Sequence, residues 1–170
     1  MAPTKILLAT LIMLLAIPSG CSEPPPSPAE MKKLNGKINQ TTMSIAVALK
    51  SMWNTEQAFT QGNYTPRKVD LETWWISLTS TRLNMKRALA TINDNPSIVD
   101  RARNLWAGRI QENLNQIIDA GLLTTMQGPI TSRLEATYGA ERVQKEMRDV
   151  LALSQKIEER LDLPEAPVPN

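Results

Sequence analysis

The side chains that could carry acid–base chemistry in this chain are mainly carboxylates, because histidine is absent and cysteine occurs once among 170 residues. Histidine is the commonest general base and the commonest transition-metal ligand in proteins. A single cysteine can form neither an intrachain disulfide nor a cysteine–histidine zinc site. We therefore expect no metal ion and no cofactor, and any catalysis would have to rest on aspartate or glutamate.

Six carboxylates crowd the last helical stretch of the sequence, where five basic side chains alternate with them. Such mixed charges are typical of a solvent-exposed helix face. Nucleophile motifs are missing as well, since the chain contains neither Gly-x-Ser-x-Gly nor Ser-x-x-Lys, and its seven glycines form no phosphate-binding loop. The pattern predicts a protein without enzymatic activity. The six carboxylates are Glu141, Glu146, Asp149, Glu158, Glu159 and Asp162.

A basic segment with two tryptophans is the other candidate, since Arg67 to Arg109 holds eight basic residues and four acidic ones. Such a surface offers charge-assisted binding of carboxylates or phosphates. Adjacent helix residues point about 100° apart, so we expect Trp75 in the core and Trp74 at its border or exposed, where tryptophan often anchors an interface. The alternative is that the cations pair with the acidic last helix. The predicted partner-binding residues are Trp74, Arg82, Lys86, Arg101 and Arg103.

The position of the single cysteine indicates where the chain is located. Lys5 is followed by an apolar run of about twelve residues, 6–17, which is too short to span a bilayer and is typical of a secretory signal. The stretch 18–21, Pro-Ser-Gly-Cys, resembles the lipobox of bacterial lipoproteins, although Pro18 stands where the lipobox favours leucine. That resemblance implies that Cys21 becomes a lipidated amino terminus. In the lipoprotein sorting rule, Ser22 in place of aspartate implies the outer membrane.

The resemblance and the proline pattern divide the chain into four parts. Residues 1–20 are expected to be the lipoprotein signal peptide, and residues 21–26 the lipidated cysteine with a proline-rich linker. Consecutive prolines favour an extended polyproline II segment rather than a helix. Residues 27–163 are expected to form a helical bundle, and residues 164–170 a disordered tail.

The elements that must position these residues are predicted to be helices. Ser27 with Glu30 fits a capping box before a helix over 28–61. Thr65 before a proline, Asn95 before a proline and Gly128 before a proline are expected to start three further helices, with a kink near Gly139. No stretch alternates as a strand would. We therefore predict an all-α, elongated, up-down-up-down four-helix bundle.

These observations favour a binding protein on the periplasmic side of the outer membrane. We expect a protein-binding module with an envelope partner, such as an accessory lipoprotein of a secretion, conjugation or pilus machine, or an exclusion or immunity lipoprotein. The net charge of +2 does not favour nucleic acid, and we expect a monomer or a weak homodimer. The alternative function is that of a cell-wall-active enzyme that uses a single carboxylate.

Overall fold

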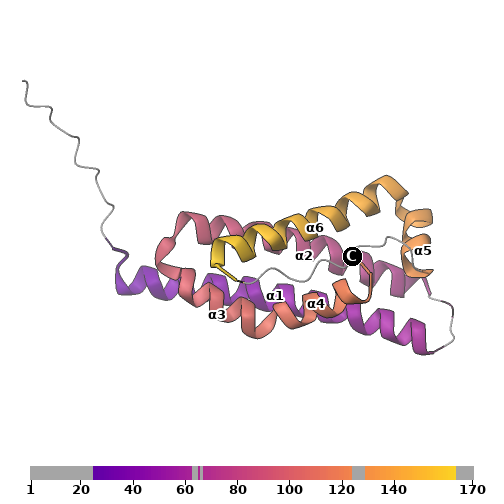
Figure 1. The fold of residues 1–170 in the computed structure, drawn as a ribbon, viewed down its shortest axis with the longest axis horizontal. Coiled ribbons are helices and arrows are strands. Elements are labelled where there is room, and N and C mark those ends of the chain that lie inside the picture. The colour runs from indigo at the N-terminus through magenta and orange to yellow at the C-terminus, as the bar shows by residue number, and fades with distance from the viewer. Residues whose placement is uncertain (1–24, 63–64, 66, 124–128, 164–170) are drawn as a thin grey trace, which may run out of the picture.

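The computed structural model describes residues 25–62, 65, 67–123 and 129–163, and this part of the chain is all-α (Figure 1). The expected signal peptide, Cys21 and the expected tail lie outside the described residues. The helices form an elongated bundle, as the sequence predicts. Within the described residues, no helix is long and apolar enough to cross a membrane.

The first helix, α1, covers Pro28–Gln61, which are the predicted bounds. Its start is fixed by the predicted capping box. The backbone N–H of Glu30 donates to Ser27 Oγ at 3.3 Å, and the backbone N–H of Ser27 donates to the Glu30 carboxylate at 2.8 Å. These bonds satisfy two of the backbone donors that a helix leaves open at its amino end.

The second helix, α2, covers Lys68–Asp94 and begins later than predicted. Thr65 is therefore not its cap. Arg67 takes that position, and its backbone N–H donates to the Asp70 carboxylate at 2.8 Å. The pairing of Arg67 with Asp70 at the third helical position replaces the cap predicted at Thr65. The Asp70 carboxylate, in the first turn, also interacts favourably with the helix dipole.

The third stretch is divided where the sequence predicts one helix. A short 3₁₀ turn, η1, covers Pro96–Ile98 and is followed by α3, Val99–Arg109, and α4, Gln111–Asp119. Asn95 precedes the turn, but its side chain donates back to the Thr91 carbonyl at 2.8 Å rather than capping the turn. The predicted stop at Gly121 is confirmed, because Gly121 has φ of +74°.

The fourth stretch is also divided, and here the predicted kink is confirmed. Helix α5 covers Pro129–Tyr138 and α6 covers Ala140–Leu161. Between them Gly139 has φ of +91° and ψ of 131°, a conformation that glycine adopts far more readily than other residues. Helix α5 lies at one end of the bundle, and α6 runs back along its length (Figure 1).

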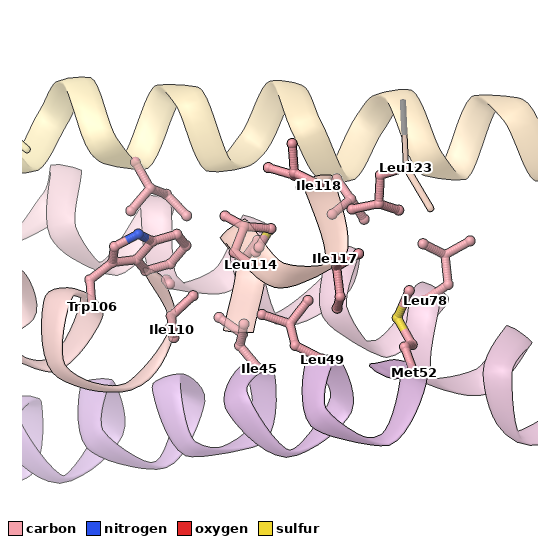
Figure 2. Close-up of a cluster of buried hydrophobic side chains, with 14 of the residues drawn as sticks. Ile45, Leu49, Met52, Leu78, Trp106, Ile110, Leu114, Ile117, Ile118 and Leu123 are labelled. Atoms are coloured by element: carbon pink, nitrogen blue, oxygen red, sulfur yellow. The ribbon is translucent and has the colours of Figure 1, made fainter. Parts of the chain in front are cut away.

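The helices pack as an up-down-up-down bundle whose core runs along its axis. Helix α1 packs beside α2, α6 lies on α2, and α3 and α4 lie on α1, while α3 also touches α6. Figure 2 shows how side chains from α1, α2, α3 and α4 meet in the interior. Each buried aliphatic side chain contributes about 1.5–3 kcal/mol through the hydrophobic effect. Members of this cluster are Ile45, Leu49, Met52, Leu78, Trp106, Ile110, Leu114, Ile117, Ile118 and Leu123.

Candidate docking surface

The prediction that Trp74 lies at the border of the core or is exposed is wrong, because its side chain is 0% exposed. Helix α2 is covered by α1 and by α6, so two adjacent side chains about 100° apart can both point into an interface. Trp75 is buried as well and stacks on Tyr138 with ring centroids 4.8 Å apart, while the Arg142 guanidinium lies 5.1 Å from its ring. Trp74 therefore belongs to the core and offers no contact to a partner.

Arg82 and Arg103 connect helices of the bundle. The Arg82 guanidinium donates to the carboxylate of Glu146 on α6, and both side chains are partly buried. Arg103 Nε donates to the Leu161 carbonyl at 2.6 Å, at the carboxyl end of α6, and its guanidinium also donates to Asp100 at 3.0 Å. For these two residues the structure shows interhelix pairing, which was the alternative interpretation of the basic segment.

Lys86 and Arg101 are exposed, but the structure does not bring them to one surface. Lys86 lies on α2 and Arg101 on α3, and in the bundle α1 and α6 each contact both of these helices. Helices α2 and α3 are thus diagonal neighbours. Within the described residues, this packing does not favour the single basic surface of the second and third helices that the sequence predicts.

A groove between α1 and α2 is the feature that sequence reasoning missed. From α1 it is lined by Met43, Val47 and small polar neighbours, and from α2 by Ile76, Ser77 and Ser80. Met43 is 44% exposed, Val47 62% and Ile76 63%. Large apolar side chains gathered at the surface and rimmed by polar residues are typical of an interaction site. The full lining is Gln40, Met43, Ser44, Val47, Ala48, Ser51, Ile76, Ser77 and Ser80.

The apolar side chains of α2 beside this groove recur every seven residues. Val69, Ile76 and Leu83 follow this spacing and are 53%, 63% and 43% exposed. A seven-residue repeat places side chains on one stripe of a helix, the stripe that a neighbouring helix covers in a coiled coil. This repeat is the sequence signal for the groove, because its residues lie outside the stripe of α2 that faces the core. We define the α1–α2 groove as the lining residues above together with Val69 and Leu83.

The carboxyl groups of Glu30 and Glu56 have pKa values that are shifted in opposite directions. Hydrogen bonds from the Ser27 side chain and backbone hold the pKa of Glu30 below its usual range, so Glu30 stays ionised at the amino end of α1. Burial raises the pKa of Glu56, which is 7% exposed, and a hydrogen bond with Thr60 opposes that shift. A raised pKa is the direction that a general acid requires, but Glu56 lies in the interior of the helix packing.

Glu56→Gln is expected to stabilise the bundle at neutral pH, because glutamine removes a buried charge and keeps the shape. The folded-state pKa is raised, so Glu56 favours folding most below its unfolded-state pKa, and that contribution is lost as pH rises through the folded-state pKa. The advantage of the variant should therefore shrink as pH falls from neutrality through the raised folded-state pKa into the usual glutamate range. Melting temperatures measured across pH check this, and a constant difference between the two proteins would contradict it.

No metal site is found among the described residues, since nowhere in them do three or more acidic, histidine or cysteine side chains gather in a way that could hold an ion. The α1–α2 groove is therefore the candidate site among the described residues. No protein-family model matches this chain, and comparison with curated proteins and with solved structures gives no match.

Proposed function

We propose that this chain is an outer-membrane lipoprotein that faces the periplasm and acts as a protein-binding module. The observation that carries the proposal is the place of Cys21, directly after an apolar run of secretory-signal length and two small residues. One acyl chain binds a bilayer marginally, whereas two or more anchor a protein firmly. A cysteine carrying a diacylglycerol therefore provides a stable anchor without a membrane-spanning helix.

The bundle would be held close to the bilayer in this arrangement. Cys21 and Pro25 are four residues apart, and four residues span at most about 14 Å. Helix α1 then begins at Pro28, so its amino end is the end of the bundle nearest to the anchor. The length of the bundle would carry the α1–α2 groove away from the membrane and into the periplasm, where an envelope protein could reach it.

Binding is favoured over catalysis by what the groove contains. Its lining consists of apolar, serine, alanine and glutamine side chains, which offer contact area but no acid, base or nucleophile with an activating partner. Accessory lipoproteins of secretion, conjugation or pilus machines fit this description, as do exclusion and immunity lipoproteins. The alternative of a cell-wall enzyme with a single carboxylate draws on Glu56, whose raised pKa makes Glu56→Gln its direct test. Loss of the cellular phenotype in a folded, anchored Glu56→Gln protein would favour the enzyme.

Palmitate labelling tests the anchor. We expect labelled palmitate to enter the wild-type protein, and we expect globomycin, which inhibits the lipoprotein signal peptidase, to cause the unprocessed precursor to accumulate. Cys21→Ser should take up no label and should be lost from the outer-membrane fraction. Glu30→Gln serves as a matched surface control and should label as the wild type does. Equal labelling of Cys21→Ser would refute the anchor.

A further inference from the structure

We propose that the α1–α2 groove holds an amphipathic helix of another envelope protein, with an uncharged contacting stripe and acidic flanks. The inference rests on the proposed function, because it names the partner of that binding module. The groove runs between two long antiparallel helices, so its natural occupant is elongated. A third helix laid along such a groove is a recurring mode of recognition, with anchors at helical spacing.

The shape of the groove suits a helix. Val69, Ile76 and Leu83 form a seven-residue repeat along one wall, while Met43 and Val47 stand on the other. The floor between them is made of small side chains, which leave room for the knobs of an incoming helix. The small floor residues, all of them buried or partly buried, are Ala48, Ser51, Ser77 and Ser80.

Hydroxyl groups in and beside the groove would not oppose its burial by a partner helix. Ser44 Oγ donates to the Gln40 carbonyl at 3.1 Å, and Thr73 Oγ1 donates to the Val69 carbonyl at 2.8 Å. Ser80 Oγ accepts from the Asn84 side chain at 3.3 Å. A covered polar group costs free energy chiefly when it loses its hydrogen bonds. These groups keep a bond to their own helix, so an apolar partner can cover them at low cost.

The charges around the groove specify the partner. No charged residue occurs in 38–49 of α1 or in 73–81 of α2, so the centre of the face is uncharged. Towards Lys50 and Leu83 the charges are basic, because 31–55 and 73–93 contain lysine and arginine but no aspartate or glutamate. At the Val69 end, Asp70 and Glu72 are paired with Arg67 and Lys68 of the same segment. Lys50, Lys86 and Arg87 are exposed at this rim, within about one turn of Val47 or Leu83. A complementary partner carries carboxylates on either side of its apolar stripe.

The same charges disfavour the other occupants. A second copy of this chain would present an equally basic face, and like charges brought together oppose association. A bilayer surface would attract lysine, but membrane-bound amphipathic faces project large side chains such as tryptophan, phenylalanine and leucine toward the lipid. Here the centre is hollow and floored by serine and alanine. The groove therefore favours a protein helix.

Site-specific photo-crosslinking in the full-length chain, in its own cells, tests this inference. A benzoylphenylalanine placed at Val47 or at Ile76 is expected to give one and the same higher-mass adduct, because both positions line the groove. The same probe at Ala152, an exposed position on α6, is the matched control and should give none. The double variant Lys50→Glu with Lys86→Glu should lower the adduct yield about tenfold, through slower charge-steered association. The control pair Arg148→Glu with Lys156→Glu, exposed on α6, should leave the yield unchanged.

Three outcomes overturn the inference. An adduct of twice the mass of the chain would mean that the occupant is a second copy. The absence of a shifted band with the probe at Val47 or Ile76 would mean that the groove contacts a bilayer surface or has no partner. Equal adducts at Ala152 would show contact without specificity. Palmitate labelling separates this inference from the anchor. Adducts without palmitate would refute the anchor alone, and palmitate without adducts would refute the groove alone.

Discussion

Trp74→Ala is expected to destabilise the bundle by about 3–5 kcal/mol, the usual cost of truncating a large buried aromatic side chain. Trp74 is 0% exposed and lies on α2, which packs against both α1 and α6. Removing the indole leaves a cavity that three rigid helices cannot close, so transfer energy and packing are both lost. The free energy of unfolding, measured by urea denaturation with circular dichroism, gives the effect directly.

Trp74→Phe is the matched control for this prediction. The indole nitrogen of Trp74 is buried and has no hydrogen-bond partner among the described residues. Phenylalanine keeps much of the apolar contact and removes a donor that is costly to bury without a partner. Its cost should therefore be less than half that of alanine. A folded Trp74→Ala protein of unchanged stability that no longer binds its partner would instead restore the surface role that the sequence suggests for Trp74.

Caps and breaks in this bundle could be predicted from the sequence because they depend on residues close together in the chain. The capping box of Ser27 with Glu30 links residues three apart. At the stop, the Gly121 N–H donates to the Ile118 carbonyl and the Leu122 N–H donates to the Ile117 carbonyl. The glycine at position 139 predicts the break between α5 and α6. In each case the signal and its structural consequence lie within one or two helical turns.

Features that depend on which helices become neighbours could not be predicted in this way. Arg82 pairs with Glu146, 64 residues away, and no local pattern distinguishes that pairing from an exposed cation. Trp74 is buried because α2 is covered on two sides, by α1 and by α6. The single apolar stripe in its sequence indicates only one covered side. The α1–α2 groove exists only once these two helices lie side by side. The candidate site therefore lies on the first and second helices, whereas the sequence predicts it on the second and third.

The break at Gly139 leads to a prediction in which two glycines respond to the same substitution with opposite sign. Gly139→Ala is expected to destabilise the bundle by about 1–3 kcal/mol, the usual cost of holding a non-glycine residue in a sparsely populated backbone region. A Cβ added at Gly139 would have nothing within 4 Å, so the cost comes from the φ of +91° and not from a clash. Asparagine should not rescue it, because the left-handed region that asparagine tolerates has ψ near +45°, whereas Gly139 has ψ of 131°.

Gly36→Ala is the matched partner of that variant and is expected to stabilise the bundle by about 0.5–1 kcal/mol. Gly36 lies inside α1, is exposed, and likewise has nothing within 4 Å of an added Cβ. The added methyl group meets open space at both sites, and alanine restricts the unfolded chain equally in both. The two variants therefore differ only in the native backbone conformation that alanine must adopt. Urea denaturation of both proteins measures the difference directly, and a loss of stability at both positions would mean that packing near each glycine, rather than backbone conformation, sets the cost.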